Sequence, residues 1–363
     1  MKVALVHDWL TNMGGAEQVV INLKRIFNDA PIYTTFYTPD NLCDELKNID
    51  VRTSRLQKKN KKVIDHKKYF PFMPRAFEAF DLNDYDLVIS SSSSCAKGVI
   101  TNSNSIHICY CHTPMRYAWE KREEYTKNMG RLKRKSVDIL LHYMRMWDVA
   151  SSNRVDYFIA NSNEVKNRIK KHYKREAYVI HPPVRCEYFN ISDTDGDYYF
   201  VLSRLVPYKR YDLAIKACKE LKRKLVIIGE GPEKDSLQKL AEGDENIIFL
   251  GRQSDEVVKK YMSECKALLF PGEEDFGIVP VEAQACGRPV IAYGKGGALD
   301  SVVPGKTGVF FENQTVEDLK EAILKFETMK FDKKEIRAHA MKFDEKEFRN
   351  KMVEFIKKVI EEY

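Results

Sequence analysis

The feature that most restricts the fold is a regular alternation of short apolar and longer amphipathic segments in the second half of the chain. Apolar runs such as 225–228 and 267–270 have the length of strands and are too short for helices. Amphipathic segments with helical periodicity, such as 211–221, separate them. Strands that alternate with helices in this way form a parallel sheet with helices on both faces.

The same patterns predict elements along the whole chain. In the first half, they predict strands at 3–6, 32–36, 87–90, 106–109, 157–160 and 177–180, a helix at 18–27, and helical basic sequence from 115 to 148. In the second half, they predict strands at 199–202, 224–228, 247–250, 267–270, 290–293 and 308–311. The helices predicted there are 211–221, 233–241, 255–263, 279–286, 298–303, 316–329, 333–342 and 345–361. Both halves therefore predict an α/β fold with a doubly wound parallel sheet.

The length of the chain suggests two domains. At 363 residues, it is long enough for two units that each bury a core. Pro182, Pro183 and an acidic run ending at Asp197 interrupt the periodicity between the halves. We expect an N-terminal domain at 1–187, a C-terminal domain at 188–344 and a terminal helix at 345–363.

The charge distribution and the cysteine content indicate which partners and which cellular compartment to expect. Residues 1–187 hold 31 Lys and Arg against 21 Asp and Glu, a net charge of +10, whereas the remainder carries −3. This asymmetry suggests two domains with different partners. The eight Cys include no CxxC pair, which favours reduced thiols. The apolar runs are far shorter than the ~20 residues of a membrane span. With no signal peptide at the N-terminus, we expect a cytoplasmic protein.

The most specific motif extends from Glu274 to Pro289. Glu274 and Glu282 flank a loop that leads into a short helix, which Gly287 and Pro289 end. The first amides of that helix lack helical acceptors and form an anion site of the kind that binds phosphate. A phosphate site between two acceptors of hydroxyl hydrogen bonds suits a nucleoside diphosphate sugar.

This Glu-x7-Glu motif, which runs on into Ala-x-Ala-Cys-Gly-x-Pro, resembles the donor-site signature of the retaining, two-domain glycosyltransferases of family 4. The resemblance covers essentially the whole chain and is strongest from 199 to 310. It implies the glycosyltransferase-B architecture, with two doubly wound domains facing a cleft and a final helix that crosses back to the N-terminal domain. It also implies transfer of a hexose to an acceptor hydroxyl with retention at the anomeric carbon.

The resemblance assigns roles to residues at the ends of strands. Arg204 and Lys209 have the family's Arg-x4-Lys spacing, and such cations suit a diphosphate. Glu274 would hold the hexose and Glu282 the ribose. The catalytic residues expected are His112, Arg204, Lys209 and Glu274. The donor-binding residues expected are Gly14, Gly15, Gly229, Gly231, Arg252, Phe276, Gly277, Ile278, Val279 and Glu282.

A second motif follows the predicted strand 106–109. Its His-Thr-Pro-Met-Arg-Tyr-Ala-Trp form resembles a subgroup that includes mannosyl- and rhamnosyl-adding enzymes of bacterial surface polysaccharides. By this resemblance His112 contacts the transferred sugar, and Arg116, Tyr117 and Trp119 bind the acceptor. A core position is the alternative for Trp119. The same resemblance implies GDP-mannose as the donor.

No cofactor and no metal are expected. Asp84 with Asp86, and Asp193 with Asp195, match the Asp-x-Asp pattern of metal-dependent sugar transferases. One pair precedes a strand, the other lies in the predicted linker, and any two acids produce this pattern by chance. No other cluster of His, Asp and Glu indicates a metal site.

A basic segment suggests where the protein works. Residues 52–75 hold nine Lys and Arg against one acid, interleaved with Tyr69, Phe70 and Phe72, and a second cluster lies at 121–135. Cations beside aromatic residues suit an anionic bilayer. We expect peripheral association with the inner face of the cytoplasmic membrane, and a polyprenyl-diphosphate-linked saccharide as acceptor. The product would be a cell-surface polysaccharide such as O-antigen, capsule or exopolysaccharide. A solvated basic loop is the alternative.

Two other functions compete with the transferase. A sugar-nucleotide epimerase of the same architecture would need acid and base side chains around the sugar, and the two motifs at Arg204 and Glu274 disfavour it. A non-enzymatic membrane- or nucleic-acid-binding module rests only on the N-terminal charge. The site residues favour the transferase, and nucleic acid is not an expected partner.

Overall fold

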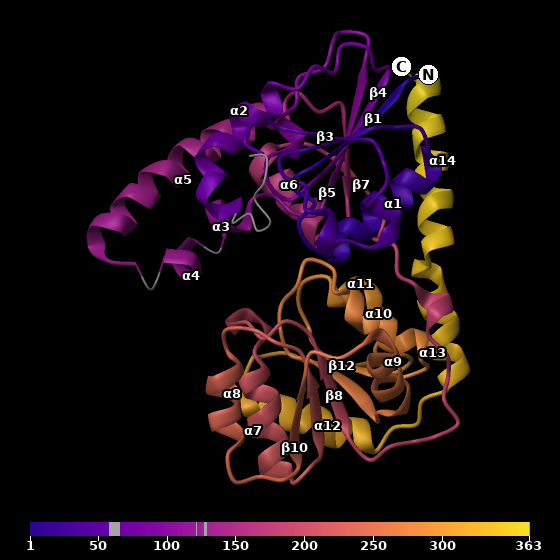
Figure 1. Cartoon of the computed structure of the whole chain (residues 1–363). Helices are drawn as coiled ribbons and strands as arrows, with labels where there is room; N and C mark the ends of the chain where they lie inside the picture. Colours follow the sequence, from indigo (N-terminus) through magenta and orange to yellow (C-terminus); the bar gives the residue numbers. More distant parts are fainter. Residues whose placement is uncertain (58–65, 121, 127–128, 363) are drawn as a thin grey trace. The chain divides into compact units, whose positions relative to one another are not determined.

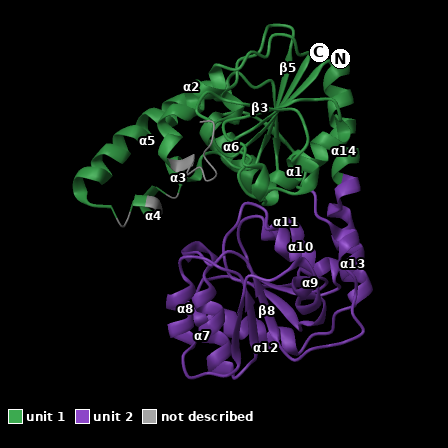
Figure 2. Cartoon of the chain, in the orientation of Figure 1, with its two compact units in different colours: residues 1–182, 348–363 green, residues 183–347 purple. Residues whose placement is uncertain are grey.

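The computed structural model describes residues 1–57, 66–120, 122–126 and 129–362 (Figure 1). The chain divides into two compact units (Figure 2). Unit 1 consists of residues 1–182 and 348–363, and unit 2 consists of residues 183–347. Each unit contains one parallel sheet with its own hydrophobic core.

The unit 1 sheet has seven strands in the order β3-β2-β1-β4-β5-β6-β7. Its strands are β1 (Val3–His7), β2 (Ile32–Thr34), β3 (Val51–Thr53), β4 (Leu87–Ser92), β5 (Ile106–Cys111), β6 (Tyr157–Ala160) and β7 (Ala177–Val179). All neighbouring strands pair in parallel. The strand order reverses between β1 and β4, and ligands of doubly wound sheets bind outside the carboxyl ends of the strands at such a point.

Helices cover both faces of this sheet. They are α1 (Gly15–Ile26), α2 (Met73–Glu78), α3 (Arg116–Trp119), α4 (Arg122–Thr126), α5 (Arg131–Ser152), α6 (Asn163–Tyr173) and α14 (Glu345–Glu362). Alternate strand residues point to opposite faces, so Leu5 packs with α1 and α14, whereas Ala4 and Val6 pack with α2 and α5. The buried side chains of α14 are Phe348, Met352, Phe355, Ile356 and Val359, whose spacing forms one helix face. The last helix of the chain is therefore part of the unit 1 core.

The unit 2 sheet has six parallel strands in the order β10-β9-β8-β11-β12-β13. These are β8 (Tyr199–Leu202), β9 (Leu225–Ile228), β10 (Ile247–Gly251), β11 (Ala267–Phe270), β12 (Val290–Tyr293) and β13 (Gly308–Phe311). The helices are α7 (Tyr211–Leu221), α8 (Lys234–Ala241), α9 (Asp255–Glu264), α10 (Ile278–Ala285), α11 (Ala298–Ser301), α12 (Val316–Glu327) and α13 (Lys333–Ala340). The order reverses between β8 and β11.

The two faces of the unit 2 sheet hold separate cores. Val201 and Leu269 pack with α7 and α12, whereas Phe200 and Leu268 pack with α10 and α13. Both sheets confirm the predicted fold class, two doubly wound parallel-sheet domains. Thr315 is the N-cap residue of α12, because its hydroxyl accepts a hydrogen bond from the Asp318 amide.

The structure differs from the sequence expectations at several elements, and helices α2 and α6 are among those that were not predicted. The predicted helical segment 115–148 is divided into α3, α4 and α5, and Gly130 precedes α5 in extended backbone. Glycine is a poor residue for a helix interior, so a break there is favourable. Strand β3 was not predicted, because this edge strand is mostly exposed and lacks apolar alternation.

We predict that Met352→Ala in α14 lowers the free energy of unfolding of unit 1 by about 2–4 kcal/mol, because it leaves a cavity in a fully buried position. All three Trp residues of the chain lie in unit 1, so tryptophan fluorescence during urea denaturation follows this unit alone. The control is Lys351→Ala at the neighbouring exposed position. Equal midpoints for Met352→Ala and wild type would contradict the packing of α14.

Candidate donor-binding and catalytic site

Lys209 and Glu274 meet at the carboxyl edge of the unit 2 sheet. Lys209 ends a short 3-10 helix (Pro207–Lys209) after β8, and Glu274 lies in the loop between β11 and α10. The ammonium group of Lys209 forms an ion pair with the Glu274 carboxylate and lies over the rings of Tyr208 and Phe270. Lys209 is 8% exposed, so Glu274 compensates the cost of burying its ammonium group. Two residues predicted to be catalytic are thus in direct contact.

Glycines pack the loops at this edge against one another. A Cβ atom at Gly229 would lie 1.8 Å from the carbonyl oxygen of Ser203, and one at Gly231 would lie 2.2 Å from that of Leu205. The Leu205 amide also donates a 2.9 Å hydrogen bond to the carbonyl of Glu230. The loops after β8 and β9 therefore touch through their backbones. This contact accounts for glycine at 229 and 231, both predicted to bind the donor.

The Glu274 loop is held in the same way. A Cβ atom at Gly297 would lie 2.1 Å from the Cα atom of Phe276, and the Gly297 amide donates a 2.9 Å hydrogen bond to the Glu274 carbonyl. The turn before α11 thus fixes the backbone next to the carboxylate.

The N-terminus of α10 is open for an anion. Gly277 is the N-cap residue with φ +86° and provides no side-chain cap. A glycine is required because only this residue adopts such a φ readily. The first amides of α10, which include Ile278 and Val279, have no acceptor within the helix. The Phe276 side chain is buried in the core, so this predicted donor-binding residue can offer a ligand only its backbone.

Glu282 lies one turn into α10 and is half-buried. Burial raises its pKa to about 7, although Arg185 opposes this shift, and the nearby Asp255 adds to it. Arg185 itself forms a 3.0 Å ion pair with Asp255. Glu282 is therefore a carboxyl group whose charge changes near neutral pH. Arg204 and Arg252, the other predicted cations of this unit, are exposed.

Unit 1 presents a second glycine-rich helix start at its own reversal point. Gly14 is the N-cap residue of α1 in extended backbone, without a side-chain cap, and Gly15 begins the helix. Beside it, the Asp8 carboxylate accepts hydrogen bonds of 2.6–2.9 Å from four consecutive backbone amides, those of residues 93–96. The backbone amides after β4 thus donate to the Asp8 carboxylate. The first amides of α1, in contrast, have no side-chain cap from Gly14.

The residues of the second motif lie at the carboxyl end of β5. His112 is half-buried, and its Nε2 atom lies 2.8 Å from the Ser91 hydroxyl. The Tyr117 hydroxyl lies 2.7 Å from that of Ser94, and Arg116 begins α3. The indole N–H of Trp119 donates a 2.8 Å hydrogen bond to Asp148, and its ring packs against the unit 1 core. The structure therefore gives Trp119 the core environment that the sequence left open as the alternative.

Several polar residues near His112 were not predicted from the sequence. His7 ends β1 and Asp8 follows it, Ser91 is the second-last residue of β4, and Glu17 lies in the first turn of α1. A signal was available, because the ends of three neighbouring strands all carry polar residues. Their proximity depends on the strand order β1-β4-β5, which the sequence alone does not give.

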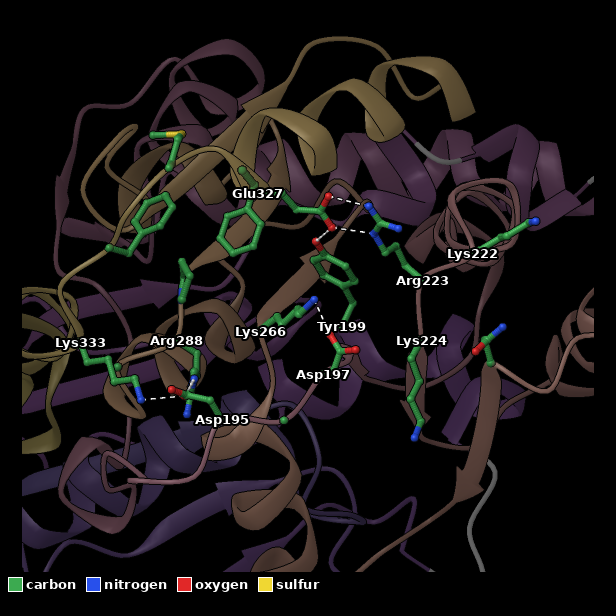
Figure 3. A pocket seen from close by; sticks show the side chains of 17 residues that line it. Asp195, Asp197, Tyr199, Lys222, Arg223, Lys224, Lys266, Arg288, Glu327 and Lys333 are labelled. Carbon is green, nitrogen blue, oxygen red and sulfur yellow. Dashed lines mark hydrogen bonds and ion pairs between the residues drawn. The ribbon is translucent and has the colours of Figure 1, made fainter.

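An open groove of about 850 Å³ lies at the opposite, amino edge of the unit 2 sheet (Figure 3). Its cations are largely paired: Arg223 with Glu327, Lys266 with Asp197, and both Arg288 and Lys333 with Asp195. Asp195, from one Asp-x-Asp pair, thus serves ion pairing here. Among the described residues, no group of three His, Cys, Asp or Glu is arranged to hold a metal ion.

Family models match nearly the whole chain. The model described as Glycosyltransferase Family 4 matches residues 13–188, and the model described as Glycosyl transferases group 1 matches residues 187–346. The chain belongs to the family 4 glycosyltransferases. Its relatives include an uncharacterised glycosyltransferase of Methanocaldococcus jannaschii, 35% identical over 47% of this chain and 49% of that protein.

A second relative of this glycosyltransferase is the GDP-mannose-dependent α-(1-6)-phosphatidylinositol monomannoside mannosyltransferase of Mycolicibacterium smegmatis. The two are 34% identical over 34% of this chain and 36% of the relative. The chain thus matches half or less of the length of these two proteins. Among solved structures, an Anabaena protein in complex with UDP and glucose has a TM-score of 0.73. It is 19% identical, with 98% of this chain and 99% of that chain covered, and it shows the shared glycosyltransferase-B fold.

We predict that Glu282→Gln stabilises unit 2 at pH 8 but not at pH 4.5. The folded-state pKa of Glu282 is raised from 4.5 to about 7, so its favourable contribution is present below pH 4.5 and lost as pH rises through 7. Replacing the buried charge should therefore raise the free energy of unfolding by about 1–3 kcal/mol at pH 8. Hydrogen exchange of β11 and β12 amides measures this, with exposed Glu256→Gln as control. An equal effect at both pH values would contradict it.

Proposed function

We propose that this glycosyltransferase moves mannose from GDP-mannose to a hydroxyl of a polyprenyl-diphosphate-linked saccharide, with retention at the anomeric carbon and without a metal ion. The observation that carries this proposal is the contact between Lys209 and Glu274 beside the open N-terminus of α10. A cation and a helix N-terminus together suit a diphosphate, and the carboxylate suits hexose hydroxyls.

In this mechanism, charge builds up on the departing diphosphate and is met by donors that are already in place. In unit 2 these are Lys209, Arg204 and the first amides of α10. Such preorganised donors act at the moment when charge develops, and losing one costs about 10²–10³ in rate. The leaving phosphate accepts the proton of the acceptor hydroxyl on the same face of the sugar.

The ion pair also suggests how the site responds to its donor. Lys209 and Glu274 pair with each other in a largely buried position. A bound nucleotide sugar offers phosphate oxygens to Lys209 and hydroxyl donors to Glu274, so both groups stay satisfied when the sugar arrives. By the resemblance, His112 would contact the donor hexose, and Glu282 would accept hydrogen bonds from the ribose.

We propose mannose as the transferred sugar and guanine as the base of the donor because of similarity to other proteins. The Mycolicibacterium relative is a GDP-mannose-dependent mannosyltransferase, and the His112–Trp119 motif resembles that of mannosyl-adding enzymes. A cell-surface polysaccharide as the final product rests on this motif alone.

Calorimetry with GDP and UDP, followed by turnover of a panel of nucleotide sugars in EDTA, tests the proposal. We predict tight binding of GDP, turnover of GDP-mannose in chelator, and a product with retained anomeric configuration. Glu282→Ala should weaken GDP binding, whereas Glu274→Ala should keep GDP affinity and lose turnover. Activity that needs added Mn²⁺ or Mg²⁺ would overturn metal independence, and binding of UDP alone would overturn the choice of donor.

We also propose that the protein binds peripherally to an anionic membrane surface, and helix α5 supports this. Leu132, Ile139, Tyr143 and Met146 share one side of this helix and are 53–86% exposed, although its other side packs in the core. Exposed Arg131, Lys133, Arg134 and Lys135 flank this apolar stripe near the start of the helix. Figure 1 shows α5 extending away from the strands of unit 1. Apolar side chains between cations suit an anionic bilayer surface, where each cation adds ~1 kcal/mol.

The basic segment 52–75 is only partly described. Lys58, Lys59, Lys61, Lys62 and Asp65 lie outside the described residues. Tyr69 and Phe70 pack against the unit 1 core, and Phe72 is exposed. In the described part of the chain, no helix is both long and apolar enough to cross a membrane.

We predict that the protein co-sediments with vesicles containing phosphatidylglycerol and is released by high salt. Replacing Leu132, Ile139 and Met146 with Ser should lower vesicle binding about tenfold or more, because their apolar area no longer enters the interface. The matched control replaces Leu324 and Ile360, exposed apolar residues on other helices, with Ser. Equal binding of both variants, or no binding of the wild type at low salt, would remove the membrane from the proposal.

A further inference from the structure

Four polar side chains form a connected chain inside unit 1. His112 Nε2 lies 2.8 Å from the Ser91 hydroxyl, and that hydroxyl lies 3.1 Å from His7 Nδ1. His7 Nε2 in turn lies 3.5 Å from a carboxylate oxygen of Glu17. His7, Ser91 and Glu17 are 1–8% exposed. The strand pairing aligns His7 with Ser91, so the chain is built into the sheet.

The contacts of His7 determine where its protons lie. His7 Nδ1 is also 3.2 Å from the carbonyl oxygen of Ser91, which can only accept a hydrogen bond. Nδ1 therefore carries a proton. Nε2 faces the carboxylate of Glu17, which favours a proton there as well. Glu17 and Asp8 raise the pKa of His7 against the opposing effect of burial, in agreement with an imidazolium at this position.

The protonation of His7 in turn determines the direction of the hydrogen bond between Ser91 and His112. Since His7 donates to Ser91, the Ser91 hydroxyl has its own proton left to donate. Within the described residues, His112 Nε2 is the acceptor in reach of that buried hydroxyl. His112 must then be unprotonated at Nε2. Burial and the charge of His7 lower the pKa of His112 to about 3, so the ring is neutral at neutral pH.

We propose that His7 and Ser91 are positioning residues that hold His112 as the neutral tautomer protonated at Nδ1. His112 then offers a hydrogen-bond donor at the carboxyl end of β5, and Glu17 keeps His7 charged. The catalytic consequence rests on the proposed function, in which His112 contacts the donor hexose. A neutral donor there can bind a sugar oxygen without adding charge beside the reacting carbon.

The other charged group near His7 does not compete for this role. Asp8 adjoins His7 in sequence, but its carboxylate is occupied by the amides of residues 93–96. Glu17 instead lies close to the start of α1, since a Cβ atom at Gly14 would be 3.0 Å from its other carboxylate oxygen. Pairing with His7 therefore also neutralises an acid beside the helix start expected to meet the diphosphate.

Nitrogen NMR of ¹⁵N-histidine-labelled protein tests the tautomer directly. In the wild type, the His112 signals, identified by their loss in His112→Gln, should show a protonated Nδ1 and an unprotonated Nε2 at pH 7. A protonated Nε2 would overturn the proposal without any further variant. Ser91→Ala should move His112 toward the Nε2-protonated form. If that variant does not fold, His7→Leu should produce the same change.

Ser90→Ala is the matched control. Ser90 precedes Ser91 in β4, and its hydroxyl lies 2.8 Å from Nε2 of the buried His107. The Ser90→Ala substitution thus removes an equivalent serine–histidine hydrogen bond that does not involve His112. The His112 tautomer should therefore not change. A shift of His112 in Ser90→Ala equal to that in Ser91→Ala would assign the effect to general loosening of the sheet and overturn the proposal.

Kinetics provide the functional measurement. Ser91→Ala should lower kcat about tenfold, the effect of one well-placed hydrogen bond, with donor KM within about twofold. Ser90→Ala should keep kcat within about twofold. If Ser91→Ala alters the His112 tautomer but leaves kcat unchanged, the tautomer has no role in the reaction, and the catalytic part of the proposal is overturned. A wild type without transferase activity would refute the proposed function, whereas the NMR result would still decide the tautomer.

Discussion

The ion pair between Lys209 and Glu274 is the interaction on which the unit 2 site depends. A largely buried ammonium group is unfavourable without a partner, and removing one member of such a pair commonly costs about 3–5 kcal/mol. The pair joins the loop after β8 to the loop after β11, on either side of the point where the strand order reverses. The same contact thus holds both charged groups beside the N-terminus of α10.

Close backbone contacts make this arrangement rigid. Gly229 and Gly231 let the loop after β9 touch the loop after β8, and Gly297 lets the turn before α11 touch Phe276. A side chain at any of these positions would separate loops that must stay in contact. Preorganised donors are effective because they do not have to move as charge develops, so these glycines serve the chemistry through the fold.

In unit 1, buried polar groups at the reversal point of the sheet are held by hydrogen bonds and an ion pair. Its reversal point holds the Asp8 carboxylate on four backbone amides, and the polar chain from Glu17 to His112 runs beside it. Buried polar groups are tolerated only when each is paired, and here every member has a partner from a neighbouring strand or helix. The result is a histidine whose orientation and protonation are set by residues behind it.

The sequence by itself determined the fold class and the positions of most strands and helices, because periodicity and length record which faces are buried. It also determined the family, through the motifs at Lys209, Glu274 and His112. It could not show that Lys209 forms an ion pair with Glu274 or that Trp119 donates a hydrogen bond to Asp148. Nor could it show that His7 and Glu17 are linked to His112 through Ser91. Those contacts join residues far apart in the chain, and only the order of strands in the folded sheet brings their side chains together.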